Sequence, residues 1–242
     1  MALQHASRHD PPWLDLQAIE AWAGGQRIVE DLSLRLWVGE STAILGPNGS
    51  GKSTLVKLIS RCLHPVVQPH SYLRLFGEER INLWSLREHL GVVDSELQQR
   101  IPDAMTCREL MHSAFFGAIG LGRGHHCTQQ QVERSADVLE QFSLSELASS
   151  QFGSLSDGQK RRMLIARAMV HQPQVLVLDE PFDGLESSIR DALERQLERI
   201  GDMDTSLIMV THHPEDLPKC MTHALVIDDG KIVRQGRLKR RP

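Results

Sequence analysis

The fold of this chain is decided by the stretch Gly46-Pro47-Asn48-Gly49-Ser50-Gly51-Lys52-Ser53-Thr54. It contains the pattern GxxxxGK[ST], and the apolar run before it predicts a buried strand while the spacing after it predicts a helix. The alternative is a glycine-rich turn that matches this pattern by chance, but such a turn would not need a strand before it and a helix after it. In this context the glycines let backbone N–H groups point at a phosphate, which the helix dipole also favours. We therefore expect the whole stretch to bind a nucleotide, with Lys52 at the outer phosphates and the Ser53 hydroxyl on Mg²⁺.

An apolar run that ends in two carboxylates marks a second candidate site. Val175 to Leu178 predicts a buried strand, and Asp179 and Glu180 follow it directly. Two solvated acids at the end of a strand are a common arrangement. Beside a phosphate-binding loop, however, such a strand ends near Mg²⁺, so we expect Asp179 to bind the ion. Glu180 is then placed to act as general base on the attacking water.

A third motif, Leu155-Ser156-Asp157-Gly158-Gln159, precedes a helix that is predicted over Lys160 to Val170. Ser156 is a natural N-cap and Gln159 is its capping-box partner, which by itself would be a sufficient structural reason for the motif. The same helix end offers a hydroxyl group, glycine N–H groups and a positive dipole end to an anion. The structural and the functional interpretation can hold together.

Strands and helices alternate along the rest of the chain. The predicted elements are short strands from Trp13 to Val38, helical patterns at about 95–170 that include 129–147, a helix from Ser187 to Ile200, a strand from Leu207 to Val210, and a hairpin from Ala224 to Val233. Asp229-Gly230 in that hairpin is typical of a type I′ turn. The alternation implies a parallel sheet that is covered on both faces.

Composition excludes several classes of protein. The 242 residues are 40% hydrophobic and 24% charged, with a mean hydropathy of −0.27, and can bury a core without disulfides. A formal net charge of −4 argues against a protein that coats nucleic acid. The four cysteines lack metal-ligand spacing, and the longest apolar stretch, Ala114 to Gly122, is too short to span a bilayer. With no signal peptide in view, we expect a cytoplasmic protein that reaches the inner face of a membrane only through a partner.

The motifs GPNGSGKST, LSDGQ and VLVLDEP, with the later Thr211-His212, together resemble the ATPase domain of ATP-binding cassette transporters. The resemblance covers about residues 13–238, and LSDGQ is its most specific part. It implies an α/β fold, with a P-loop NTPase core, an N-terminal antiparallel β element and an inserted helical subdomain at about 95–170. We expect a flexible leader at 1–12, a single ATPase domain at 13–238 and a basic tail at 239–242.

The resemblance also implies roles for individual residues, with ATP and Mg²⁺ as cofactors. Trp22 would stack on adenine, although a tryptophan packed at a strand edge is the alternative. His212 would contact the γ-phosphate and orient Glu180, so that Lys52, Glu180 and His212 form the catalytic set. The γ-phosphate held by one subunit would meet the opposite subunit's Ser156, Asp157, Gly158 and Gln159. The active species would then be a homodimer or a cassette heterodimer around two shared nucleotides.

Two positions depart from the family pattern. Ser95 stands where the family has glutamine after a strand, and the nearest candidates to replace that glutamine are Gln98 and Gln99. Glu186 stands where the family usually has aspartate. In transporters the loop at 95 faces the transmembrane partner, so the first departure concerns partner coupling more than ATP binding.

Two functional hypotheses follow. The first is the ATPase subunit of a transporter whose membrane-spanning subunit is a separate polypeptide. The alternative is a soluble cassette ATPase with a role in repair, translation or regulation, which the Ser95 departure favours. Nucleic acid is not expected as a partner. The transported substrate would be chosen by the membrane subunit, because a shared fold does not determine function.

Overall fold

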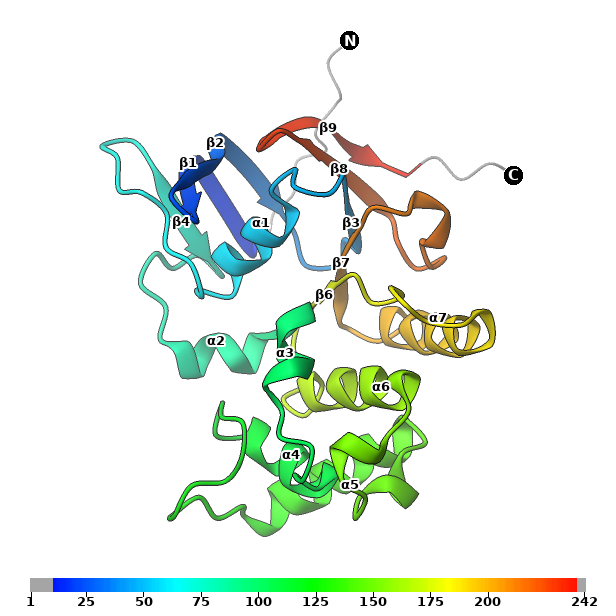
Figure 1. Ribbon diagram of the computed structural model, residues 1–242. Coiled ribbons are helices and arrows are strands. Elements are labelled where there is room, and N and C mark those ends of the chain that lie inside the picture. Colours follow the sequence, from blue (N-terminus) through cyan, green and yellow to red (C-terminus); the bar gives the residue numbers. More distant parts are fainter. Residues whose placement is uncertain (1–10, 239–242) are drawn as a thin grey trace.

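Residues 11–238 are described by the computed structural model, and they form two sheets with helices around them (Figure 1). Most of the predicted leader and the basic tail at 239–242 lie outside the described residues. A six-stranded sheet has the order β5-β6-β7-β3-β8-β9, in which only β9 runs antiparallel to its neighbour. A three-stranded antiparallel sheet has the order β2-β1-β4. The predicted α/β fold class is confirmed.

The antiparallel sheet is the predicted N-terminal β element. Its strands are β1 (Leu14–Ala23), β2 (Gln26–Leu36) and β4 (Tyr72–Leu75). The first two form a hairpin around Gly24-Gly25, where both glycines have positive φ angles that side-chain-bearing residues adopt only at a cost. Sequence patterns did not predict β4, because four residues carry too little periodicity.

The six-stranded sheet is the centre of the molecule. Its strands are β3 (Thr42–Leu45), β5 (Leu90–Val93), β6 (Val175–Asp179), β7 (Ser206–Thr211), β8 (His223–Asp228) and β9 (Lys231–Arg237). Every residue of β6 and β7 is buried, as expected for parallel strands that are covered on both faces. The last two strands form the predicted hairpin, and Asp229 and Gly230 both have positive φ, as a type I′ turn requires.

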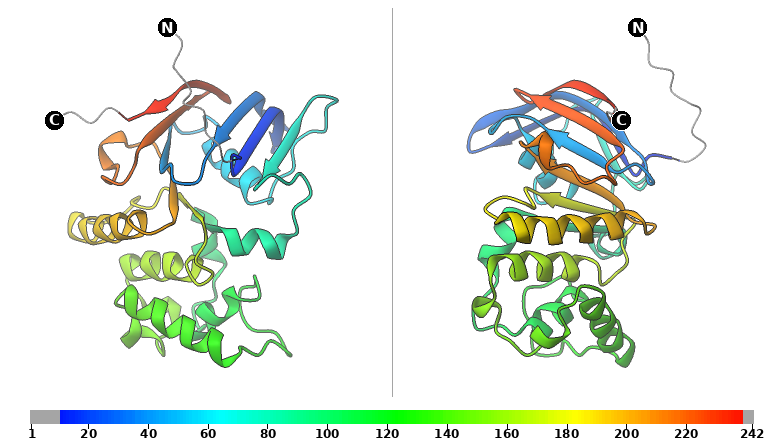
Figure 2. Two further views of the ribbon diagram at one scale, coloured as in Figure 1. Left: turned by 180° about the vertical axis from the view of Figure 1, so that it is seen from behind. Right: turned by 90° about the vertical axis from the view of Figure 1, so that its right-hand side faces the viewer.

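Helices cover the six-stranded sheet and extend beyond it (Figure 2). They are α1 (Lys52–Ile59), α2 (Leu83–His89), α3 (Ser95–Arg100), α4 (Cys107–Ala114), α5 (Gln129–Gln141), α6 (Asp157–Ala168) and α7 (Ser187–Gly201), with short 3-10 turns at Ser145–Leu147, Phe152–Ser154 and Pro214–Asp216. The helices α4, α5 and α6, green to yellow-green in Figure 2, gather at the end of the molecule opposite β9. They lie in the stretch where we predicted a helical subdomain.

Two helix boundaries differ from their predictions. The pattern over 129–147 is not one helix, because α5 ends at Gln141 and Ser143 has a φ of 51°, which breaks the helical path. The helix predicted from Lys160 begins at Asp157 instead, since Ser156 caps it directly. The start of this helix therefore belongs to the LSDGQ motif itself.

The two faces of the six-stranded sheet bury two separate hydrophobic cores. Alternate residues of one strand belong to different cores: Val175 and Val177 pack with β1, β2 and α1, whereas Leu176 and Leu178 pack with α4 to α7. The parallel strands all end at one edge between these layers. Ligands of open parallel sheets bind at that carboxyl edge, which directs attention to the loops after β3, β5, β6 and β7.

Candidate active site

The loop between β3 and α1 has a conformation that only glycine permits at two positions. At Gly46, with a φ of 153°, a Cβ atom would lie 2.0 Å from the carbonyl oxygen of Ile227. Gly51 stands at the N-cap of α1 with a φ of 103°. The loop is thereby held against the β8–β9 hairpin while the first turn of α1 opens toward the carboxyl edge of the sheet, as an anion-binding loop requires.

Lys52 lies over this loop and is 95% buried, at 5% exposure. Its Nζ donates hydrogen bonds to the carbonyl oxygens of Gly46, at 2.8 Å, and of Pro47, at 2.9 Å. The hydroxyl of Ser50, inside the same loop, is buried and has no hydrogen-bond partner. A buried ammonium group and an orphaned hydroxyl group are the groups that a phosphate oxygen would satisfy.

Asp179 ends β6 next to the Ser53 hydroxyl, which hydrogen-bonds to it. The carboxyl group is almost fully buried, and its Oδ1 accepts no hydrogen bond. Burial raises the pKa of Asp179, the nearby charges of Glu180 and Asp94 raise it further, and the hydrogen bond from Ser53 opposes them. A buried carboxylate with a free oxygen beside a hydroxyl group suits Mg²⁺, which would relieve this electrostatic cost.

A metal at this position would take few ligands from the protein. Within residues 11–238, no group of three or more His, Cys, Asp or Glu side chains is arranged to hold a metal ion. Mg²⁺ is commonly bound by one or two protein groups together with phosphate oxygens and water. Ser53 and Asp179 therefore fit such an ion only when a nucleotide phosphate is present as well.

Glu180 and His212 lie in contact although they come from different strands. Glu180 follows β6 with a φ of 49°, and its N–H group donates to the carbonyl oxygen of Val210 at 2.9 Å. Its Oε1 lies 3.0 Å from Nδ1 of His212, which follows β7. A glutamate with positive φ is costly, and it persists here because Val210 of β7 holds its backbone and His212, directly after β7, holds its side chain. The carboxylate is thus aimed and fixed, as a general base must be.

His213 takes no part in this contact. Its Nδ1 lies 3.1 Å from the carboxylate of Glu215, and its ring packs against that of His212 with 3.9 Å between the centroids. The interpretation of His212 as the functional histidine of the pair therefore agrees with the geometry.

Ser156 caps α6 in the way the sequence predicts. Its Oγ accepts a hydrogen bond from the N–H group of Gln159, and Gln159 Oε1 accepts one from the N–H group of Ser156 at 2.9 Å. Ser156 and Asp157 remain exposed. In the described part of the chain, no hydrogen bond or ion pair joins residues 156–159 to residues 46–54. The capped helix end is therefore free to meet an anion that its own loop does not hold.

Gly158 has a packing reason that the sequence does not reveal. A Cβ atom at this position would lie 2.3 Å from Cγ2 of Ile189 in α7. The close approach of α6 to α7 at this point therefore requires a glycine. Replacing Gly158 by alanine is expected to destabilise the protein by about 1–3 kcal/mol, because the branched Ile189 side chain cannot move aside freely. Urea unfolding of Gly158→Ala would measure this. Gly236→Ala is the control, since a Cβ there meets nothing within 4 Å, and equal midpoints for the two variants would contradict the packing argument.

Trp22 lies at the end of β1, paired with Arg27 of β2, and is 47% exposed. Its Nε1 donates to Oε1 of Glu20 at 2.6 Å, and Glu20 also accepts a hydrogen bond from Gln68. The next residue of β2, Ile28, lies against the loop between β3 and α1, here called the phosphate loop. A Cβ atom on Gly51 would lie 3.5 Å from the carbonyl oxygen of Ile28. An exposed indole ring that is fixed by its N–H group beside the loop fits an adenine platform better than it fits a packed edge residue.

Neither Gln98 nor Gln99 takes the place of the glutamine that is absent at Ser95. Asp94 caps α3 by accepting a hydrogen bond from the N–H group of Leu97 at 2.7 Å, and Ser95 is exposed. Gln98 and Gln99 lie within α3, and among the described residues no hydrogen bond joins either side chain to the phosphate loop or to Asp179. The residue after β5 whose charge acts on Asp179 is instead Asp94, because β5 pairs with β6 with Val93 opposite Leu178. Sequence reasoning missed it, although its place directly after a strand was a usable signal.

Comparison with known proteins gives a consistent result. A family model described as ABC transporter matches residues 29–183. The chain is 38% identical over 218 residues to the ABC transporter ATP-binding protein ModF of Escherichia coli, covering 86% of this chain but 43% of that protein. It is 30% identical over 227 residues to the uncharacterised ABC transporter ATP-binding protein YmeB of Lactococcus lactis, covering 93% of this chain and 86% of that protein. The chain thus spans less than half of ModF and most of YmeB.

A solved structure shares the fold. CbiO1 of Clostridium perfringens, described as part of the ABC transporter complex CbiONQ, superposes with a TM-score of 0.76 at 25% identity, over 94% of this chain and 89% of that one. The similarity extends over both sheets and the helical end, since nearly all of each chain is covered.

Proposed function

Because this chain belongs to the ABC transporter family and is an ATP-binding cassette of that family, we propose that it is the ATPase subunit of a transporter whose membrane-spanning part is a separate polypeptide. The observation that carries the proposal is the meeting of three groups at one edge of the sheet. They are the glycine loop with Lys52, the Ser53–Asp179 pair and the Glu180–His212 pair. In the described residues no helix is long and apolar enough to cross a bilayer.

The proposed hydrolysis assigns a separate task to each of these groups. Backbone N–H groups of the loop and Lys52 bind the phosphates, after Lys52 releases the two loop carbonyls that it contacts. When bound through Ser53 and Asp179, Mg²⁺ would supply charge neutralisation at the phosphates. Glu180, oriented by His212, accepts a proton from the attacking water. Trp22 holds the base by stacking.

The proposed active species is a dimer. Ser156, Asp157, Gly158 and Gln159 form a helix N-terminus that attracts anions, yet they make no bond to the phosphate loop of their own chain. A second cassette in head-to-tail orientation would bring this helix end to the γ-phosphate. ATP would then hold the interface together, and hydrolysis would loosen it. In this arrangement the subunit works at the cytoplasmic face of the membrane.

The alternative is a soluble cassette ATPase without a membrane partner. It is favoured by one observation, the absence of a glutamine at Ser95, where the chain instead presents Asp94 and a short helix. Both functions share the same ATP chemistry, so only the partner separates them.

A pull-down from gently solubilised cells tests the transporter role. Tagged wild-type protein and Glu180→Gln, each in the presence of ATP, are expected to recover a polytopic membrane protein, with more of it in the variant because ATP stays bound. Lys52→Ala, which cannot hold the phosphates, is the matched control and should recover less. Recovery of soluble partners alone from all three samples would reject the transporter role in favour of the alternative.

A further inference from the structure

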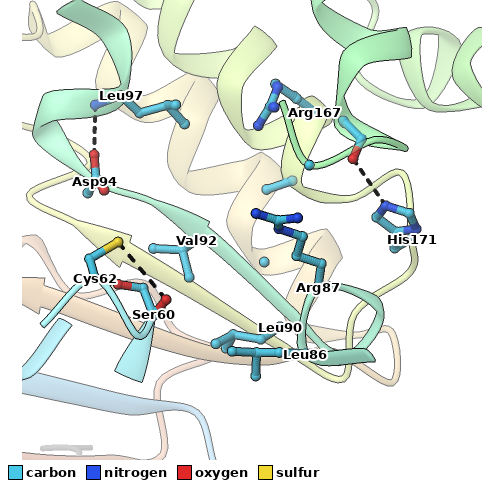
Figure 3. Close-up of a pocket in the computed structure, with 14 residues that line it drawn as sticks. Ser60, Cys62, Leu86, Arg87, Leu90, Val92, Asp94, Leu97, Arg167 and His171 are labelled. Atoms are coloured by element: carbon cyan, nitrogen blue, oxygen red, sulfur yellow. Dashed lines mark hydrogen bonds between the residues drawn. The ribbon is translucent and has the colours of Figure 1, made fainter. Parts of the chain in front are cut away.

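A cavity in the helical end of the molecule lies between α4 and α5, here called the α4–α5 cavity (Figure 1). Its volume is about 290 Å³. Figure 3 shows a different pocket, the one beside β5, and among the described residues the two share no lining side chain. None of the residues that we assign to phosphate, base or catalysis lines the α4–α5 cavity either. It is therefore separate from the nucleotide site.

The buried residues that line the α4–α5 cavity form its floor, which is apolar apart from one hydroxyl group. Met111 of α4 and Leu139 of α5 supply the apolar part. Ser135, one turn before Leu139 on the same face of α5, is 2% exposed, and its Oγ has no hydrogen-bond partner in the described part of the chain. A hydroxyl group that is buried without a hydrogen bond costs free energy. A ligand that accepts a hydrogen bond from Ser135 would remove this cost.

The rim of the cavity carries one positive charge. Arg108 and His112, one turn apart on α4, both line the cavity. Within residues 11–238 no carboxylate forms an ion pair with Arg108. Burial lowers the pKa of His112, and the positive charge of Arg108 lowers it further. At neutral pH the imidazole is therefore uncharged, whereas the guanidinium group keeps its charge.

These groups define the chemistry of a ligand. A carboxylate accepts hydrogen bonds from a guanidinium and a hydroxyl group, and its single negative charge matches the single positive charge at the rim. A phosphate ester carries close to two negative charges, one of which would stay unmatched beside the apolar floor. The cavity volume of about 290 Å³ lies at the lower limit of the roughly 300–1,000 Å³ of small-molecule sites. The carboxylate therefore belongs to a small molecule.

We propose that the α4–α5 cavity binds a small monocarboxylate with an apolar body, whose carboxylate is held by Arg108 and Ser135 while its body packs on the apolar floor. The inference goes beyond the proposed ATPase function and does not rest on it. The site is nevertheless tied to the helix that carries LSDGQ. Arg134, the neighbour of Ser135 in α5, donates hydrogen bonds to the carbonyl oxygens of Met169 and Val170 at the end of α6, each at 3.1 Å.

Hexanoate and hexanamide test the proposal on the full-length protein. They share one apolar chain and differ in the charge of the head group, and their affinities are measured by calorimetry. Wild type is expected to bind hexanoate at least about tenfold more tightly than hexanamide, because hydrogen bonds to a charged group are stronger than neutral ones. In Arg108→Gln this preference should disappear, and Arg108→Lys should restore part of it. Ser135→Ala should weaken the binding of hexanoate by at least about fivefold.

The stability of Ser135→Ala separates a binding role from a structural one. Without ligand this variant should unfold in urea at the same concentration as wild type or at a higher one, because the hydroxyl group has no partner to lose. Ser113→Ala is the matched control. The hydroxyl group of Ser113 is also buried, but it donates to the carbonyl oxygen of Leu110 at 2.8 Å and does not line the cavity. This control should be less stable than wild type and keep its affinity for hexanoate.

Three results would overturn the proposal: equal affinity for hexanoate and hexanamide, no saturable binding of hexanoate, or an unchanged affinity for hexanoate in Arg108→Gln. Hexyl phosphate is titrated in parallel and is expected to bind more weakly than hexanoate, because its second negative charge has no partner in the cavity. If hexyl phosphate binds more tightly, and in an Arg108-dependent way, the cavity is a site for phosphate esters and the assignment to a carboxylate is wrong.

Discussion

Glu180→Gln is expected to lower ATP turnover by about 10²–10⁴-fold, the usual contribution of a positioned general base, while ATP binding is retained. Glutamine has the shape of glutamate but cannot accept the proton of the attacking water. The backbone contact from the Glu180 N–H group to Val210 does not involve the side chain, so the strained turn after β6 should persist. The phosphate loop, Lys52 and Asp179 are left unaltered. The measurements are phosphate release at saturating Mg-ATP and nucleotide affinity by equilibrium binding.

A matched carboxylate provides the control for this experiment. Glu215 also lies beside a histidine, at 3.1 Å from Nδ1 of His213, but it is exposed and lies outside the site. Glu215→Gln should therefore turn over ATP at the wild-type rate. If Glu180→Gln retained most of its turnover, or lost its nucleotide affinity to the same extent as its turnover, the assignment of Glu180 as the base would be wrong.

The parts of this site that sequence predicts are those that depend on neighbouring residues in the chain. The glycine loop, the two acids at the end of β6 and the cap at Ser156 each follow from a run of adjacent residues whose local geometry is fixed by turn, strand and helix rules. The hairpin at Asp229-Gly230 is of the same kind. In each case the physical constraint lies within a few residues, so one sequence suffices.

The remaining parts depend on contacts between distant segments. Asp94 approaches the metal position only because β5 pairs with β6 in a particular register, which a single sequence does not specify. Gly158 is explained by a helix that begins about thirty residues later, through the close approach of Ile189. The structural consequence of the departure at Glu186 is likewise visible only in the fold. Glu186 occupies the N-cap of α7, but its side chain forms no capping hydrogen bond, which aspartate would form more readily.

The second large effect is expected from mixing two inactive variants. Lys52→Ala removes the phosphate contact of the loop, and Ser156→Asp places a negative charge where the γ-phosphate of the partner cassette would lie. Aspartate is as good an N-cap as serine, so the variant keeps the structural role of Ser156 and removes only the proposed functional one. Each variant alone should have little turnover, because both sites of its homodimer carry the same defect. Thr128→Asp, which changes the capped start of α5 in the same way, is the control and should remain active.

Equal amounts of the two variants should recover about a quarter of the wild-type turnover, because half of the random dimers are mixed and each mixed dimer has one intact site out of two. The intact site combines the loop of the Ser156→Asp chain with the helix end of the Lys52→Ala chain. If the motif served the phosphate loop of its own chain, every site in the mixture would remain defective. A mixture no more active than its components would therefore reject the head-to-tail dimer, whereas recovery would place Ser156 and Lys52 in one site across two chains.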